Sequence, residues 1–161
     1  MAEPLTIGPR VLIRAWHKRK DRAVVQHWPM PQVPAHWFHA EPSNEKRTSF
    51  AVGLRPEVQW ERNLIGRITL RDQHRDSAMV GLILHPDYAH RGFGSEALNI
   101  FCDYAFRQLG LALLRLEVAA DNAAARQCYE KCGFTYFTER ERNGYSYAQY
   151  ARLKLVIGAT A

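Results

Sequence analysis

A strand, a glycine-rich turn and a helix start follow one another directly, and this order constrains the fold more than any other stretch of the chain. The run SAMVGLILH at 77–85 is apolar, has the length of a strand and stops at Pro86. The turn AHRGFGS follows, and apolar residues then recur every three or four positions over 95–109. That spacing is typical of one face of an amphipathic helix, and Gly110 is a suitable residue to end it.

The turn itself has the properties of an anion site. Gly92 and Gly94 permit a tight turn and a close approach of a ligand to the backbone, while the unpaired N–H groups of the first helical turn point to the same place. His90 and Arg91 add side-chain donors, so a phosphate fits there. Ser95 is equally well explained as a first-turn residue. The sequence contains no GxxxxGK[ST] motif, and this turn lacks the third glycine of a dinucleotide-binding fold.

A second strand and helix follow closely. LLRLEVA at 113–119 alternates between apolar and polar positions and predicts a half-buried strand. Asn122 can cap the next helix, which Gly133 ends, and Tyr129 lies two turns after Asn122 near the same helix face. Taken singly, Asn122 is explained as a cap and Tyr129 as a core aromatic residue with a solvated hydroxyl.

The remaining segments complete an α/β (α+β) order with a mixed sheet. A strand is expected at 11–16, a short helix at 21–27 and an antiparallel pair at 48–54 and 64–70. Residues 134–155 predict two strands joined by a turn at Asn143-Gly144. No linker divides the sequence, so we expect one domain over 1–161.

Composition narrows the class of protein. The chain has 22 Lys+Arg against 16 Asp+Glu, a formal charge of +6, and 47% apolar residues, which favours a folded core over disorder. Without a recognisable signal segment or long apolar run, we expect a soluble cytoplasmic protein with no membrane contact. The basic run at 17–22 is either a solvated helix start or a nucleic-acid contact, and the small charge excess argues against nucleic acid as a partner.

Two stretches together resemble a known family. LILHPDYAHRGFGSEAL at 82–98, followed by LRLEVAADNAAARQCYEKCGF at 114–134, is similar to the core of the GNAT superfamily of N-acetyltransferases, and its second half to ribosomal-protein alanine N-acetyltransferases. The resemblance implies a twisted, mostly antiparallel sheet flanked by helices, with a splayed strand pair that holds the arm of coenzyme A (CoA), and acetyl-CoA as cosubstrate.

The resemblance also assigns roles to individual residues. It implies that the cofactor-binding residues are Leu82, Ile83 and Leu84 along the pantetheine arm, His90, Arg91, Gly92, Phe93, Gly94 and Ser95 at the pyrophosphate, and Asn122 at the pantetheine. Tyr129 would be the acid that protonates the departing thiolate, and Glu117 the base.

Amine chemistry gives Glu117 independent support. An amine must be neutral to attack a thioester, and a carboxylate that accepts its proton helps. A protein α-amino group, with a pKa of about 7.7–8.0, is partly neutral at pH 7, whereas a lysine at about 10.4 is almost wholly charged. Glu117 is alternatively a solvent-facing partner of Arg115 or another neighbour. Two positions depart from the family pattern, Ala89 before the first glycine and Met79 in the first strand, and the latter removes one candidate base.

We therefore expect an N-acetyltransferase in which an amine attacks acetyl-CoA directly in a ternary complex, as a monomer or homodimer and without a metal. A protein N-terminal α-amine of the ribosomal-protein type is the favoured acceptor, with a small amine or polyamine as the alternative. Two other classes are a CoA-binding module without catalysis and a basic RNA-associated protein. Trp28, Trp37 and Phe38 either form a wall of the acceptor pocket or attach their loop to the core. The three cysteines, expected to be reduced, fall in apolar helical patterns and are expected in the core: Cys102, Cys128 and Cys132.

Overall fold

One sheet runs through the protein. The computed structural model describes residues 3–37, 46–55 and 64–155, in which eight strands follow the order β1-β2-β3-β4-β5-β6-β8-β7. The strands are β1 (Pro4–Ile7), β2 (Val11–Ala15), β3 (Arg47–Leu54), β4 (Leu64–His74), β5 (Ser77–Leu84), β6 (Leu113–Ala119), β7 (Thr135–Arg142) and β8 (Tyr145–Leu153). The helices are α1 (Lys20–Val25), α3 (Phe93–Arg107) and α4 (Ala123–Lys131), with 3-10 turns η1 (Ala35–Trp37) and η2 (Pro86–Tyr88). The predicted α/β (α+β) class with a mixed sheet is confirmed.

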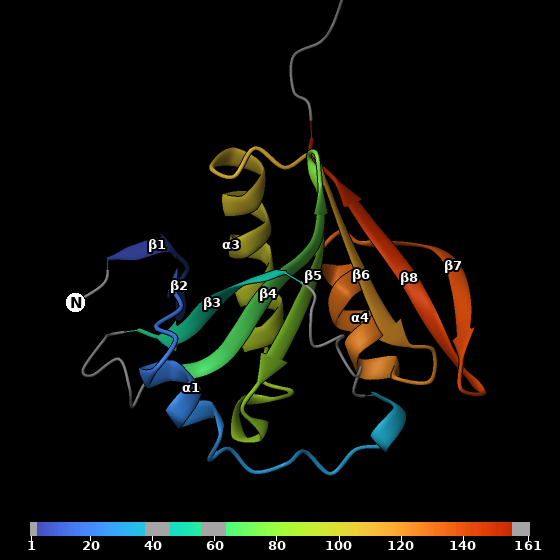
Figure 1. Cartoon of the computed structure of the whole chain (residues 1–161), viewed down its shortest axis with the longest axis horizontal. Coiled ribbons are helices and arrows are strands. Elements are labelled where there is room, and N and C mark those ends of the chain that lie inside the picture. Colours follow the sequence, from blue (N-terminus) through green and yellow to red (C-terminus); the bar gives the residue numbers. More distant parts are fainter. Residues whose placement is uncertain (1–2, 38–45, 56–63, 156–161) are drawn as a thin grey trace, which may run out of the picture.

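The only parallel neighbours in this described sheet are β5 and β6, and they stay together for a short distance. Their register joins Ser77–Met79 to Leu113–Arg115, and beyond Met79 the two strands are no longer paired. Every other neighbouring pair is antiparallel. Figure 1 shows β5 and β6 meeting at one end and separating toward the other. The splayed strand pair that the resemblance implies is therefore present.

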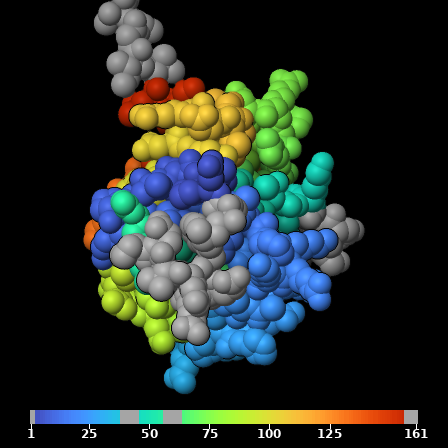
Figure 2. Space-filling model, turned by 90° about the vertical axis from the view of Figure 1, so that its left-hand side faces the viewer, coloured from blue at the N-terminus to red at the C-terminus, as the bar shows by residue number. Residues whose placement is uncertain are grey.

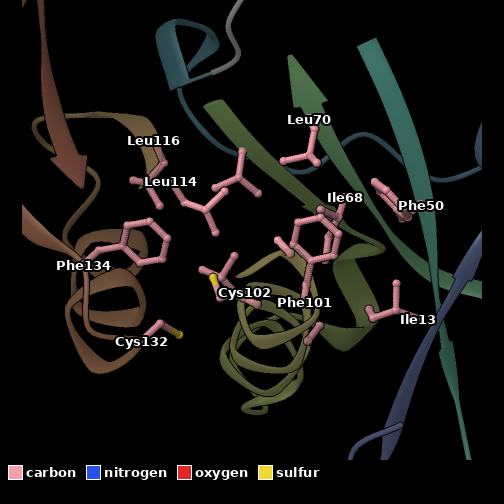
Figure 3. Close-up of a cluster of buried hydrophobic side chains, with 14 of the residues drawn as sticks. Ile13, Phe50, Ile68, Leu70, Phe101, Cys102, Leu114, Leu116, Cys132 and Phe134 are labelled. Carbon is pink, nitrogen blue, oxygen red and sulfur yellow. The ribbon is translucent and has the colours of Figure 1, made fainter. Parts of the chain in front are cut away.

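The main core lies between α3 and the sheet. Phe101 and Cys102 of α3 are fully buried at its centre, and Figure 3 shows them facing side chains from both halves of the sheet. The core cluster around them includes Ile13, Phe50, Ile68, Leu70, Leu114, Leu116 and Phe134. One face of α3 thus holds the β1–β5 half and the β6–β8 half together across the splay.

The opposite face of β2 carries a buried ion pair. Ile13 points into the main core, so Arg14, the next residue, points to the other face, where it meets Asp21 of α1. Arg14 donates from Nη1 to Asp21 Oδ2 at 2.7 Å and from Nη2 to Oδ1 at 2.8 Å, and the His17 N–H also donates to Oδ2. Asp21 is 1% exposed, so this pair fixes the six-residue α1 on the face opposite α3.

Several boundaries differ from the predictions. The helix expected from Ser95 begins at Phe93, because Gly92 with a φ of +82° forms its N-cap, and β4 extends past 70 to His74. The short edge strand β1 was not predicted. None of the helices in the described ranges is long and apolar enough to cross a membrane.

Candidate active site

A cavity of about 950 Å³ lies where β5 and β6 separate. Its walls come from the ends of both strands, the start of α3, one face of α4 and part of β3 and β4. Of the residues predicted to act in catalysis or to bind the cofactor, those in its lining are Leu82, Ile83, Leu84, His90, Gly92, Gly94, Ser95, Glu117, Asn122 and Tyr129.

The end of β5 offers a free strand edge to this cavity. Leu82, Ile83 and Leu84 pair with β4 on one side, opposite Ile68, Arg67 and Gly66. On the other side, no described strand pairs with β5 beyond Met79. An extended ligand arm can therefore add to this edge through backbone hydrogen bonds, as a peptide adds to a sheet.

The glycine-rich turn is shaped for close contact with a ligand. Gly92 has a φ of +82° and His90 a φ of +59°, and a Cβ built on Gly92 would lie 3.1 Å from Nη2 of Arg10. The first N–H that the α3 backbone pairs is that of Glu96, which donates to the Gly92 carbonyl at 3.1 Å. The N–H groups of the preceding turn are therefore available to an anion.

Two residues predicted at this turn are placed differently from the others. The Phe93 side chain is 7% exposed and belongs to the core, with the Arg10 guanidinium 4.3 Å from its ring centre. Arg91 is exposed, stacks on Tyr88 and Phe93, and is not part of the cavity lining. Any contact of Phe93 with a phosphate would therefore be through its backbone.

Asn122 and Tyr129 lie at the start and on the second turn of α4. Asn122 is the N-cap, and its Oδ1 accepts the Ala125 N–H at 3.2 Å. The Tyr129 ring contacts Phe134 and Tyr150 edge-on, and its phenol makes no hydrogen bond with the residues that the structure describes. Burial, and after it the neighbouring Cys128, raise the pKa of Tyr129 well above its ordinary value. The phenol therefore keeps its proton at physiological pH and can donate it.

Glu117 faces the cavity from β6 with a nearly buried side chain. Arg142 of β7 donates to Oε1 and Gln149 of β8 donates to Oε2. Arg115 donates to Ser77 and Asp72 instead, so the alternative that Glu117 pairs with Arg115 is wrong. The alternative that Glu117 pairs with another neighbour is correct, and that neighbour is Arg142. A carboxylate oxygen has more than one lone pair, so these two hydrogen bonds do not by themselves prevent Glu117 from accepting a proton.

Neither partner of Glu117 was identified from the sequence. Gln149 is 4% exposed in an otherwise apolar stretch of β8. A polar residue between apolar neighbours was the one sequence signal that this position needs a buried hydrogen-bond partner. Arg142 gave none, because it lies in a run of alternating charges that any exposed strand could carry.

Cys128 corrects the expectation that all three cysteines lie in the core. Cys102 and Cys132 are buried, but Cys128 is half-buried and lines the cavity. Its Sγ lies 3.1 Å from Ser95 Oγ. Hydrogen bonding to the Cys132 thiol, and next to Ser95, lowers the pKa of Cys128 to about 6. Cys128 therefore lies on the side of α4 that meets Ser95 of α3, and not in the core.

The proline-rich loop after α1 passes below the ends of β5 and η2 and reaches β6 (Figure 1). Its residues also form the lower edge of the face shown in Figure 2. His36 Nε2 lies 2.9 Å from Asp121 Oδ2, and Trp37 Nε1 donates to Asp121 Oδ1 at 2.8 Å. The His36 hydrogen bond lowers the pKa of Asp121.

The aromatic residues of this loop have separate positions. Trp37 lines the cavity, whereas Trp28 lies edge-on to His85 with ring centres 5.4 Å apart. Phe38 lies outside the described residues. Trp37 thus lies in the cavity wall, and its hydrogen bond to Asp121 holds the loop in place. Within the described ranges, no group of three or more His, Cys, Asp or Glu side chains is placed to hold a metal ion.

Several known proteins are similar to this chain in sequence and in fold. The acetyltransferase (GNAT) domain family matches residues 10–135. The [ribosomal protein bS18]-alanine N-acetyltransferase of Salmonella typhimurium is 35% identical over 132 residues, which cover 73% of this chain and 83% of that protein. The spermidine N(1)-acetyltransferase of Vibrio cholerae is 38% identical over 77 residues, which cover 46% of this chain and only 44% of that protein.

Solved structures agree on the fold. The V. cholerae spermidine N-acetyltransferase in complex with CoA and spermine superposes with a TM-score of 0.65 at 19% identity, over 91% of this chain and 96% of that one. Mycobacterium smegmatis RimJ in complex with CoA-disulfide gives a TM-score of 0.65 at 19% identity, over 94% of this chain and 90% of that one. On the family match, which covers most of the sequence, the chain belongs to the GNAT family of acetyltransferases.

Proposed function

We propose that this protein transfers the acetyl group of acetyl-CoA to a primary amine by direct attack in a ternary complex. The main support is the cavity between the separating ends of β5 and β6. An unpaired β5 edge, the glycine-rich start of α3, the Glu117 carboxylate and the Tyr129 phenol all line it. The family match supports acetyl-CoA as the donor. We further propose that residues 1–161 act as one domain, in the cytoplasm, as a monomer or homodimer.

The proposed site divides its work among three groups of residues. The β5 edge from Leu82 to Leu84 binds the pantetheine arm, the turn at 90–95 binds the pyrophosphate, and Asn122 contacts the arm through the amide group that its cap does not use. His90 and the N–H groups of the α3 start neutralise phosphate charge, because unpaired donors and the positive end of the helix dipole converge there.

The chemical step then needs one base and one acid. The amine nitrogen attacks the thioester carbonyl, so that a C–N bond forms and the C–S bond breaks. Glu117 accepts the proton that the nitrogen loses, and Tyr129 gives its phenolic proton to the departing CoA thiolate. No covalent enzyme intermediate is needed, and the products are the amide and free CoA.

The acceptor is proposed to be a protein N-terminal α-amine. Such an amine is partly neutral at pH 7, which suits a site whose proposed base is a carboxylate. The similarity to a bS18-alanine acetyltransferase, over most of both proteins, supports this choice. A polyamine is the second candidate, supported by the similarity to a spermidine acetyltransferase over less than half of each protein.

A direct assay tests the proposal. The protein is mixed with acetyl-CoA and a panel of peptide N-termini, polyamines and small amines, and free thiol release is followed alongside the mass of the amine. We expect thiol release that depends on one class of amine, with a gain of one acetyl group. CoA binding without turnover for any amine would identify a non-catalytic CoA-binding module instead.

A further inference from the structure

Three arginines line the cavity on the face of the sheet opposite α3. Ile68 and Leu70 of β4 point into the core, so the alternate residues Arg67 and Arg71 point to the other face of the sheet. Arg47 of β3 is the direct partner of Arg71 in the antiparallel register. All three belong to the cavity lining, together with Thr69.

The register places this wall opposite Glu117. Thr69 pairs with Gly81 of β5, and Gly81 and Glu117 are each two residues beyond the paired Met79 and Arg115. Thr69, Gly81 and Glu117 therefore lie in one row across the splay. The backbones of β4 and β6 are two strand spacings apart there, at least about 10 Å.

Arg67 and Arg71 flank this row. Each lies two residues from Thr69 along β4, a distance of about 6.6 Å. A ligand in the cavity thus has a carboxylate on one side and guanidinium groups on the other.

The positive charge at this wall is held partly away from water. Arg67 donates from Nε and Nη2 to Ser49 Oγ at 3.1 and 2.7 Å, and its guanidinium lies 4.9 Å from the Trp16 ring centre. Burial lowers the pKa of Arg67, and the nearby charges of Arg47 and Arg22 lower it further. Ser49 accepts only from Nε and Nη2 of Arg67. A half-buried guanidinium is stabilised by an anion that accepts hydrogen bonds from its other N–H groups.

We propose that the acceptor carries an anionic group, a carboxylate or phosphate, several bonds from its reacting amine, and that Arg67 binds that group while the amine faces Glu117. This inference rests on the proposed acetyltransferase function and narrows its acceptor. For a peptide, the anion is an acidic side chain close after the N-terminus. A polycationic amine such as spermidine would place positive charge against this wall and is disfavoured.

Binding and turnover are measured separately, so that a failure of the anion site can be distinguished from a failure of the proposed acetyltransferase function. With CoA present, calorimetry compares Ala-Asp-Ala-Ala peptide amide with its Asn counterpart, and 4-aminobutanoate with butylamine, to distinguish a peptide acid from a small-molecule acid. We expect the acid of at least one pair to bind roughly tenfold or more tightly than its neutral analogue, the effect of a charge-assisted hydrogen bond. Spermidine is expected to bind more weakly than either acid.

Two arginine variants locate the effect. Arg67→Gln should remove most of the preference for the acid and raise its KM, while the KM for acetyl-CoA stays unchanged; Arg67→Lys should restore part of the preference. Arg115→Gln is the matched control, because Arg115 points to the same face but pairs with Asp72 outside the cavity lining. Thermal melts verify that each variant is folded.

Each outcome bears on either the anion site or the acetyltransferase function. Equal binding of acids and neutral analogues, or a preference that survives in folded Arg67→Gln, overturns the anion site even if amines are acetylated. A preference that is present and lost in Arg67→Gln supports the site, even if no amine is acetylated and the proposed function fails. An increase in the acetyl-CoA KM alone would assign Arg67 to the cosubstrate and also overturn the inference.

Discussion

Gln149 and Glu117 are direct partners across the β8–β6 pair, and the amide of Gln149 donates to Glu117 Oε2. Together with Arg142 of β7, it holds the carboxylate from the β7–β8 hairpin. The proposed base is thus held in one orientation before any substrate binds. Preorganisation of this kind lets an acid or base act without first being moved into position.

Glu117→Gln removes the carboxylate with little change in shape. We expect kcat at pH 7 to fall by roughly a hundredfold or more, in the range of general-base contributions. The loss should shrink as the pH rises, because the free amine becomes abundant and needs less help. The measurement is kcat against pH for both proteins. Full activity of the variant at pH 7 would assign proton removal to water or another residue.

Tyr129→Phe keeps the ring and removes only the proton donor. Because the phenol makes no hydrogen bond with the described residues, its loss should leave the melting temperature nearly unchanged. CoA affinity should survive while kcat falls about a hundredfold or more. Calorimetric titration with CoA beside steady-state kinetics tests this. A loss of CoA affinity equal to the loss of kcat would make Tyr129 a binding residue.

Local patterns predicted the elements but not the contacts between them. The alternation at 113–119 and the helical spacing at 95–109 each report which face of one segment is buried, so β6 and α3 followed from the sequence. The partners of Glu117 did not, because Arg142 and Gln149 reach it only through the return of the β7–β8 hairpin beside β6. In the same way, Arg67 and Arg71 have the polar alternation of any half-exposed strand, and only the splay places them in a cavity wall.

Gly92→Val tests the turn, with Gly110→Val as its matched control. Both glycines have a positive φ, +82° and +70°, but a Cβ on Gly110 would meet nothing within 4 Å, and Gly110 is not in the cavity lining. Each variant should lose stability from backbone strain of about 1–3 kcal/mol. Only Gly92→Val should also weaken CoA binding, because its side chain occupies ligand space. Calorimetry and melts of both variants measure the two effects, and unchanged CoA affinity in folded Gly92→Val would contradict the phosphate assignment.

Asp21→Asn tests how α1 is held. The substitution removes one charge of a buried ion pair, in a site where Asp21 is 1% exposed, so we expect a loss of about 3–5 kcal/mol in the free energy of unfolding. Asp72→Asn removes the carboxylate of the exposed Arg115–Asp72 pair and should cost no more than about 1 kcal/mol. Urea denaturation of the three proteins compares the values. Equal losses would show that burial does not determine the strength of these pairs.

Cys128 should react as a thiolate near neutral pH. Its pKa is lowered from 9.0 to about 6, whereas burial raises that of Cys102 to about 12. Since the thiolate is the reactive form, the rate of alkylation by iodoacetamide should rise through pH 6 and level off by pH 7–8, while Cys102 stays unmodified. Cys128 also lines the cavity, so saturating CoA should slow its alkylation without changing its midpoint. Peptide mass mapping against pH identifies the labelled residue, and Cys128→Ser provides the control. A rate that keeps rising to pH 9 would show an ordinary thiol, and a rate that CoA leaves unchanged would place the ligand away from Cys128.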